Sequence, residues 1–271
     1  MDFIQSIIIG IVEGITEFLP ISSTGHMIIA EKLLGVKEND FSTLFTVAIQ
    51  LGAILSVVVL YWKKFFGPVA SEVNRWRFYA KLIAAVIPAL FFGYLFSDKI
   101  DTLLESTTTV VISMLLGGIV LVLIDNYFKR PTVETEERIT FIKAFFIGIW
   151  QVIAMIPGVS RSAASIIGGM QQRLTRKLAA EFSFFLAVPT MLAATAYKLL
   201  KTYKTDPEVL KDKHNLVILG VGNLVAFIVA MLAIKFFIGY LQKHGFKVFG
   251  YYRIVVGIIL LLMMISGYLP R

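Results

Sequence analysis

Residues 13–26 read EGITEFLPISSTGH, and this stretch decides how the rest of the chain is organised. Two glutamates, a Ser-Ser-Thr run and a histidine gather within it, and Pro20 and two glycines interrupt it. The sequence on both sides is apolar enough to lie in lipid. Because charged side chains are costly at that depth, residues kept there mark functional sites. The stretch therefore predicts a polar site inside a membrane protein.

The composition supports a membrane-embedded protein. Of the 271 residues, 57% are hydrophobic and 16% are charged, against about 25% charged in soluble domains. The net charge is +8, and the basic residues stand beside apolar runs. This pattern is typical of helix ends that face anionic lipid, and we expect no nucleic-acid partner. The absence of cysteine excludes disulfides and thiolate chemistry. No basic segment precedes the first apolar run, so we expect no cleaved signal peptide.

The apolar runs predict an all-α integral membrane protein with a single polytopic domain over 1–271. Two segments are interrupted, at Pro20 and at PGVSRS (157–162), and their halves are too short to cross a bilayer comfortably. We interpret them as re-entrant helical hairpins at about 3–34 and 144–172. The alternative is a single kinked spanning helix. Six transmembrane helices are predicted at 43–62, 82–97, 109–127, 178–197, 215–235 and 251–269.

The distribution of lysine and arginine predicts the orientation. With both interrupted segments re-entrant, one side of the membrane holds 16 of the 26 basic residues and the other holds 9. The basic side consists of the loops at 63–81, 128–143, 173–177 and 235–253. Because basic loops stay in the cytoplasm, we expect both termini outside. The two hairpins then have opposite orientations.

An inverted-topology repeat is predicted from this orientation and from a weak internal similarity. Gly10–Ser23 resembles Gly148–Ser160, with Glu13 matching Gln151. In that pairing Pro20 matches Pro157, and Ser23 matches Ser160 with a one-residue slip. Inverted repeats with broken helices place a binding site near the midplane of the bilayer.

Glu13 and Glu17 are four residues apart and share one face of a helix. Like charges at this spacing repel each other, so a proton or a cation has to neutralise them. Carboxylate oxygens suit Mg²⁺ or Ca²⁺, and Mg²⁺ is commonly shared between carboxylates and substrate phosphates. The alternative is that one glutamate bonds to the backbone of the hairpin.

The segment after Pro20 is predicted to begin a second half-helix, whose free amides attract an anion. Ser22 or Ser23 could cap this helix, and capping alone is a strong alternative to a chemical role. His26 follows three and four residues later, within side-chain reach of both. A hydroxyl beside an imidazole is a nucleophile–base pair, although the histidine could itself attack phosphorus.

Ser160-Arg161-Ser162 is the second polar cluster. An arginine in a hairpin tip needs an anionic partner, and its planar fork suits phosphate oxygens. The alternative is a salt bridge to Glu13 or Glu17. Together these groups are the components of phosphoryl transfer. Their place in a membrane predicts a lipid-borne phosphate ester or anhydride as the substrate.

EGITEFLPISSTGH (13–26) and PGVSRSAAS (157–165) closely resemble the undecaprenyl-diphosphate phosphatase family, also called bacitracin resistance proteins. FTVAIQLGAILSVV (45–58) and AAEFSFFLAVPTM (179–191) resemble it more weakly. The resemblance covers essentially the whole chain. One departure is Ala163, where a glycine is expected, and it removes no reactive group.

The resemblance implies hydrolysis of undecaprenyl diphosphate to the monophosphate carrier reused in cell-wall synthesis, and bacitracin resistance. It also implies a divalent cation (Mg²⁺ or Ca²⁺), a polyprenyl diphosphate lipid partner, and a bacterial inner-membrane location with the site open to the outer face. The resemblance does not decide between a monomer and a homodimer. The site carried over by position is Glu13, Glu17, Ser22, Ser23, Thr24, His26, Ser160, Arg161 and Ser162.

Within this site the hypothesis assigns Glu13 and Glu17 to the cation or to a water molecule, and Arg161 to the diphosphate. Ser23 or His26 attacks the terminal phosphorus, and water is a third candidate. The rival from another class is a transporter or flippase for a lipid phosphate or a small anion. A purely structural scaffold leaves the buried glutamates and arginine unexplained.

Overall fold

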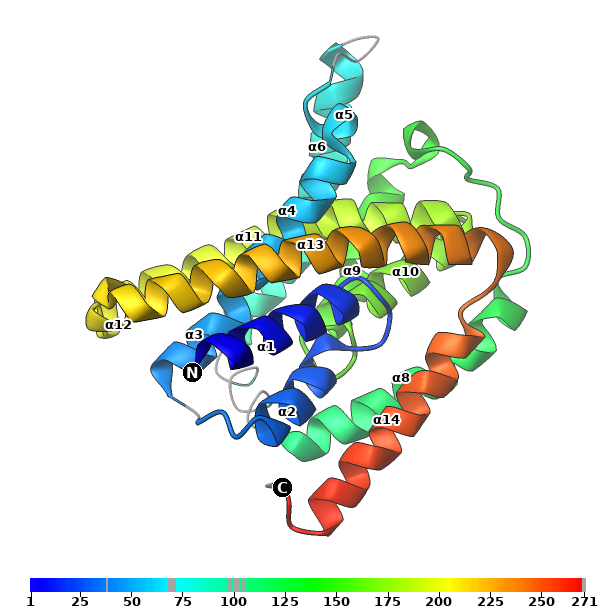
Figure 1. The fold of residues 1–271 in the computed structure, drawn as a ribbon. Coiled ribbons are helices and arrows are strands. Elements are labelled where there is room, and N and C mark those ends of the chain that lie inside the picture. The colour runs from blue at the N-terminus through cyan, green and yellow to red at the C-terminus, as the bar shows by residue number, and fades with distance from the viewer. Residues whose placement is uncertain (38, 68–71, 97–98, 100–102, 104–105, 270–271) are drawn as a thin grey trace.

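The computed structural model describes residues 1–37, 39–67, 72–96, 99, 103 and 106–269. The secondary structure of this part of the chain is almost entirely α-helical (Figure 1). Six of its helical segments are long and apolar enough to cross a membrane. They are Asp40–Leu60, Arg75–Leu95, Thr107–Tyr127, Arg176–Thr205, Lys213–Lys243 and Lys247–Ile265. Each overlaps one of the six predicted spans, so the prediction of a multi-pass α-helical membrane protein is confirmed.

The spanning segments are built from seven helices. The first segment contains α3 (Asp40–Ala48) and α4 (Gln50–Leu60), which meet at Ile49. The others are α6 (Glu72–Leu95), α8 (Thr107–Tyr127), α11 (Arg176–Thr205), α13 (Lys213–Lys243) and α14 (Lys247–Ile265). Short pieces connect them: α5 (Trp62–Phe65), a 3₁₀ turn (Glu136–Arg138) and α12 (Glu208–Lys211).

Several helices extend beyond the apolar runs that predicted them. The helix α6 begins at Glu72, well before residue 82, and α13 continues to Lys243. Lysine, arginine and glutamate are good helix formers, and long basic side chains can reach water from the end of a span. Hydrophobicity therefore marks the membrane-embedded part of each helix, and not its ends.

Two pairs of short helices complete the fold. The helices α1 (Phe3–Thr16) and α2 (Ser23–Leu33) are separated by a non-helical break at residues 17–22. The helices α9 (Phe141–Ile153) and α10 (Arg161–Gln171) are separated by a second break at residues 154–160. Both second helices begin inside the polar motif, before the apolar run resumes. Their polar first turns therefore lie at the breaks.

The two breaks have the same backbone construction. Ser22 and Ser160 are the N-caps of α2 and α10, with φ angles of 71° and 77°. Their Oγ atoms accept hydrogen bonds from Gly25 N at 3.4 Å and Ala163 N at 3.3 Å. Such left-handed angles are uncommon for residues other than glycine and are strained. Serine is kept in this conformation at both breaks.

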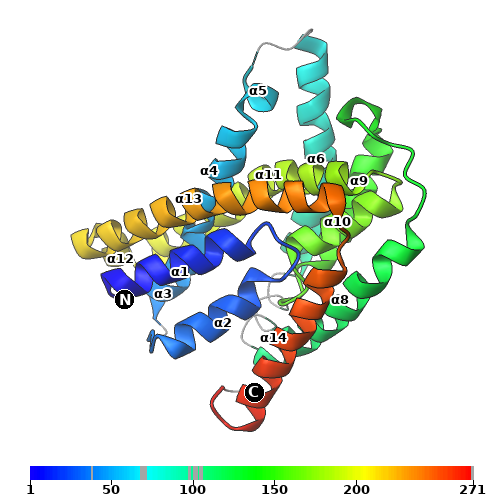
Figure 2. The ribbon, with the colours of Figure 1, turned by 45° about the vertical axis from the view of Figure 1, so that its right-hand side comes forward.

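Close helix packing sets the position of both pairs. A Cβ atom added at Gly10 would lie 2.8 Å from Gly222 O, and one at Gly148 would lie 2.1 Å from Ala85 O. The helix α1 therefore packs backbone to backbone on α13, and α9 packs in the same way on α6. Figures 1 and 2 show α1 alongside α13, and α8 alongside α14. The two breaks meet between the α1–α13 pair and the α8–α14 pair.

Candidate functional site

A buried ion pair joins the two breaks. Arg161 Nη2 lies 3.1 Å from Glu17 Oε1, and the two side chains are 12% and 7% exposed. Glu17 is the C-cap of α1 and Arg161 is the first residue of α10, so two segments far apart in sequence meet here. This is the salt bridge that the sequence offered as the alternative for Arg161, and it does not exclude phosphate binding by the same side chain in a substrate-bound state.

Ser23 shares the carboxylate of Glu17. Its Oγ donates a hydrogen bond to Glu17 Oε2 at 2.9 Å, while Oε1 faces Arg161. Ser23 is the first residue of α2, where the free backbone amides of a helix N-terminus gather. A hydroxyl bonded to a carboxylate is a nucleophile beside a base. The serine that sequence reasoning placed beside an imidazole bonds a glutamate instead.

His26 is held by two other groups. Its Nδ1 lies 2.7 Å from the carbonyl oxygen of Ser22, and its Nε2 lies 2.8 Å from Tyr252 Oη. A carbonyl only accepts, so Nδ1 carries the proton, and in the neutral ring Nε2 accepts from Tyr252. The two rings are also stacked, with centroids 5.5 Å apart. His26 therefore fixes the backbone turn that presents Ser23.

The serines beside Arg161 fasten one break to the other. Ser162 Oγ donates to the carbonyl oxygen of Leu19 at 2.8 Å, and it lies 3.0 Å from Ser160 Oγ. Thr24 is half-buried beside Ser23. Each predicted site residue thus lies at or next to the junction of the two breaks, and Ser162 links them directly.

Ser183 on α11 supports the arginine and was missed by sequence reasoning. Its carbonyl oxygen accepts from Arg161 Nη1 at 2.9 Å, and its hydroxyl lies 2.7 Å from Ser165 Oγ. Phe18 lies under the guanidinium, whose central carbon is 5.7 Å from the ring centroid. A serine within the phenylalanine-rich run 182–185 was the available signal, because a hydroxyl at that depth needs a partner.

Arg253 is the second residue that sequence reasoning missed. It is fully buried, and its guanidinium donates to the carbonyl oxygens of Gly158 and Val159 at 2.8 Å and of Pro20 at 3.4 Å. It also donates to Ser113 and Met114 of α8 at 3.0 and 3.4 Å. Counting Arg253 among the basic loop residues was therefore wrong, because it holds both breaks from inside the protein. Its position at the start of an apolar run gave no sign of this role.

Two polar atoms of the site have no hydrogen-bond partner among the described residues. They are Glu13 Oε1 and Arg161 Nε, and both are buried. Glu13 is 1% exposed and lies one helical turn before Glu17. Buried polar atoms are nearly always paired in folded proteins. A carboxylate oxygen calls for a cation or a proton, and a guanidinium N–H calls for an anion.

These features define a multi-pass membrane protein whose buried site brings together a serine hydroxyl, a carboxylate and an arginine. The sequence matches the family described as bacitracin resistance protein BacA over residues 6–259. The chain belongs to this family.

Similarity to individual proteins extends over nearly the whole chain. It is 59% identical over 263 residues to a protein of Flavobacterium psychrophilum named undecaprenyl-diphosphatase, covering 97% of this chain and 96% of the relative. A protein of Porphyromonas gingivalis with the same name is 52% identical, with 98% of each chain covered. One from Bdellovibrio bacteriovorus, again with this name, is 48% identical over 99% of this chain and 98% of the relative.

Proposed function

We propose that this protein hydrolyses undecaprenyl diphosphate to undecaprenyl phosphate and inorganic phosphate, and so recycles the lipid carrier of cell-wall synthesis. The observation that carries the proposal is the carboxylate of Glu17, which faces the Ser23 hydroxyl on one oxygen and Arg161 on the other. The names of the relatives supply the substrate. The family that the chain belongs to is described by its resistance to bacitracin, and we extend that resistance to this protein.

The groups at the junction support a two-step reaction. Ser23 Oγ attacks the terminal phosphorus while Glu17 Oε2 takes its proton, and the bond from phosphorus to the lipid monophosphate oxygen breaks. Glu17 passes that proton to the departing monophosphate oxygen and is again a carboxylate. Arg161 binds the charge on the phosphoryl oxygens. Water, deprotonated by Glu17, then attacks the phosphoserine, releases phosphate and restores the Ser23 hydroxyl. Hydrolysis is favoured over lipid transport because a carrier needs the arginine but has no use for the Ser23–Glu17 pair.

The proposal predicts phosphate release and a trapped phosphoserine. Purified protein given a polyprenyl diphosphate labelled on the terminal phosphate should release labelled phosphate. Rapid acid quenching should leave label on Ser23, and Ser23→Ala should remove both signals. Label on His26 would reassign the nucleophile, and turnover without any labelled protein would assign the attack to water. A complete lack of phosphate release with any added cation would leave lipid transport as the function.

Glu13 and Glu17 fit a hard divalent cation, Mg²⁺ or Ca²⁺. The orphaned Oε1 of Glu13 is an oxygen donor without a partner, and such cations select oxygen ligands. No group of three or more histidine, aspartate and glutamate side chains that could hold a metal is found in the described part of the chain. The remaining ligands would therefore come from substrate phosphate and water. A bound cation would supply neutralisation of the diphosphate charge.

Glu13→Gln should raise the cation concentration needed for half-maximal phosphate release. The change removes a charge but keeps the shape of the side chain, so we expect a shift of about tenfold, equivalent to roughly 1.4 kcal/mol. The measurement is phosphate release titrated with Mg²⁺ or Ca²⁺ after chelation. Glu208→Gln, an exposed carboxylate outside the site, is the control. An unchanged cation titration for Glu13→Gln would contradict this assignment.

The two helix pairs are proposed to be re-entrant hairpins related by an inverted repeat. Helices α1 and α9 are too short to span a bilayer. The strained caps Ser22 and Ser160 follow Glu13 and Gln151 by the same nine positions. This correspondence pairs Ser160 with Ser22 and not with Ser23, and the one-residue slip then falls at the prolines, because Pro20 aligns with Gly158. In both pairs a buried side-chain oxygen, Glu13 Oε1 or Gln151 Oε1, has no described partner.

Single cysteines should report the proposed orientation, with both termini outside and the site open to the outer face of the inner membrane. The chain has no cysteine of its own. A membrane-impermeant thiol reagent should label Glu208→Cys but not Glu134→Cys in intact spheroplasts, and both after lysis. Both side chains are exposed in the structure. Labelling of Glu134→Cys before lysis would overturn the orientation.

A further inference from the structure

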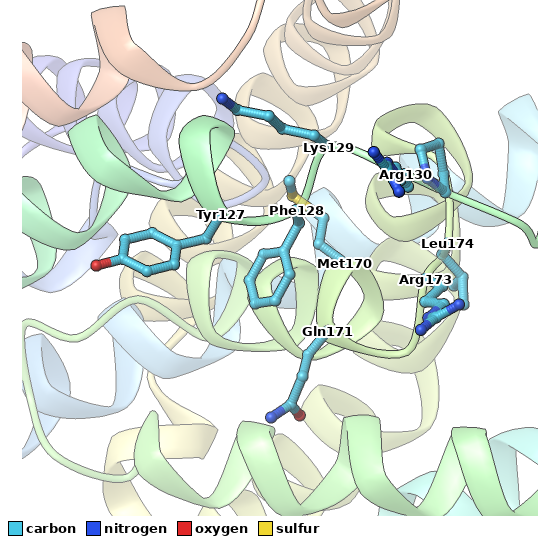
Figure 3. Close-up of a pocket in the computed structure, with 9 residues that line it drawn as sticks. Tyr127, Phe128, Lys129, Arg130, Met170, Gln171, Arg173 and Leu174 are labelled. Atoms are coloured by element: carbon cyan, nitrogen blue, oxygen red, sulfur yellow. The ribbon is translucent and has the colours of Figure 1, made fainter.

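A pocket of about 470 Å³ lies between the segment that follows α8 and the turn that follows α10 (Figure 3). Its size falls in the range of roughly 300–1,000 Å³ that is typical of small-molecule sites. Arg161 begins α10 at the ion pair, and Gln171 ends α10 at the pocket. At about 1.5 Å per residue, the two ends are roughly 15 Å apart. The pocket is therefore separate from the catalytic site.

The pocket is lined by three cations for which the described residues supply no partner. Lys129, Arg130 and Arg173 line it, and no acidic residue does so among the described residues. None of the three side chains forms a hydrogen bond or ion pair within the part of the chain that the structure describes. The nearby carboxylate of Asp125 is already engaged by Arg176 Nε at 2.8 Å. The positive charge of the pocket is thus left for an anion from outside the chain.

The backbone holds two of these cations together at some cost. Arg173 has a φ of 64°, in the turn after α10 where glycine is the usual residue. Its carbonyl oxygen accepts hydrogen bonds from Thr132 N at 2.9 Å and Val133 N at 3.0 Å, which fixes the neighbouring segment that carries Arg130. A strained conformation kept by an arginine suggests a use for that side chain.

The pocket lies at the end of a candidate membrane span. It begins at Tyr127, the last residue of the candidate span α8 and 77% exposed. Aromatic residues of this kind are enriched at membrane–water interfaces. Leu116, Val120 and Leu123 form an exposed apolar strip along α8 that leads to this end. An acyl chain on that strip would bring its headgroup to the three cations.

We propose that this pocket binds the phosphate headgroup of an anionic membrane phospholipid, with phosphatidylglycerol as the test case. Arginine forks match phosphate oxygens. The apolar strip on α8 favours a lipid over free inorganic phosphate, which has no use for it. The site is independent of the proposed catalytic function.

The test compares two triple variants that lose the same charge. Lys129→Gln/Arg130→Gln/Arg173→Gln removes the pocket cations. Lys198→Gln/Lys201→Gln/Lys204→Gln removes three lysines near the C-terminal end of α11, whose N-terminal end lies next to the pocket residue Arg173. Native mass spectrometry follows phosphatidylglycerol or phosphatidylcholine binding to the detergent-purified protein. The pocket variant should bind phosphatidylglycerol at least about tenfold more weakly, since each interfacial cation contributes about 1 kcal/mol. Phosphatidylglycerol binding to the control variant should change less than about twofold. Phosphatidylcholine should bind equally to the wild type and to both variants.

Inorganic phosphate, added as a competitor, separates the two sources of the ligand. If it displaces phosphatidylglycerol from the wild type at micromolar concentration, the pocket takes free phosphate and the lipid assignment is wrong. Equal weakening in the two triple variants would also overturn the proposal, because the effect would then be one of general charge. The unfolding temperature of each variant in detergent checks that the protein is folded.

Arg173→Gly keeps the proposal testable if the triple variant fails to fold. Glycine accepts the positive φ, so this variant should unfold at the same or a higher temperature than the wild type. It should nevertheless bind phosphatidylglycerol several-fold more weakly. Unchanged binding in a stably folded Arg173→Gly protein would contradict the role of this arginine.

Discussion

Arg161→Ala is expected to reduce kcat/KM for polyprenyl diphosphate by at least about a thousandfold. The substitution removes the group proposed to bind the phosphoryl charge, and loss of a single donor to such charge typically costs 10²–10³ in rate. It also leaves the carboxylate of Glu17 buried without its counterion. Phosphate release under saturating cation measures the effect. Glu17→Ala should be equally damaging, because it removes the base.

A double variant separates catalysis from stability. Arg161→Ala/Glu17→Ala removes both charges, so it should unfold at a higher temperature than either single variant and still be inactive. Arg161→Lys keeps the charge but loses the planar fork. Compared with Arg161→Ala, it should restore the unfolding temperature more than it restores phosphate release. Arg138→Ala, on an exposed residue, is the matched control. Near-normal activity of Arg161→Ala in a folded protein would refute the assignment.

Arg253→Met is expected to destabilise the protein by at least about 3 kcal/mol. Methionine fills similar volume but leaves the carbonyls of Pro20, Gly158 and Val159 without their donor, and an unsatisfied buried acceptor costs roughly 1–3 kcal/mol. For a chain of this size the apparent unfolding temperature in detergent should fall by about 6–12 °C. Activity should fall with it, since the breaks that carry Ser23 and Arg161 lose their common support.

The control for Arg253 lies on the same helix. Lys247→Met makes a comparable change at an exposed position of α14 and should leave both readouts within error. Arg253→Lys should have an intermediate effect, because an ammonium reaches fewer carbonyls than a guanidinium. A wild-type unfolding temperature for Arg253→Met would mean that the carbonyls find other donors.

Hydrophobic runs predicted the helices, and polar interruptions predicted where the site would lie. Every spanning segment was found because lipid requires about 20 apolar residues per crossing. The breaks were found because Glu13, Glu17 and Arg161 are too costly in lipid without a function. Both signals are local, so one sequence was enough to find them.

Contacts between distant segments could not be predicted from these patterns. The assignment of a partner to Ser23 failed because His26 is near in sequence, whereas the bond to Glu17 depends on how the turn at 17–22 folds back. Ser183 and Arg253 were missed because their roles depend on packing against the breaks. Gly117 illustrates the point, since a Cβ there would lie 2.3 Å from Arg253 Nη2.

Arg253 also gives the site an order of assembly during synthesis. Ser23 lies within the first 26 residues and Arg161 near the middle of the chain, yet the guanidinium of Arg253 that holds both breaks is in the last described helix. As the ribosome makes the protein from its N-terminus, neither break has its final support until α14 has entered the membrane. The growing chain would therefore carry its reactive groups in an unsupported and inactive arrangement. The enzyme would become active only when its translation is almost complete.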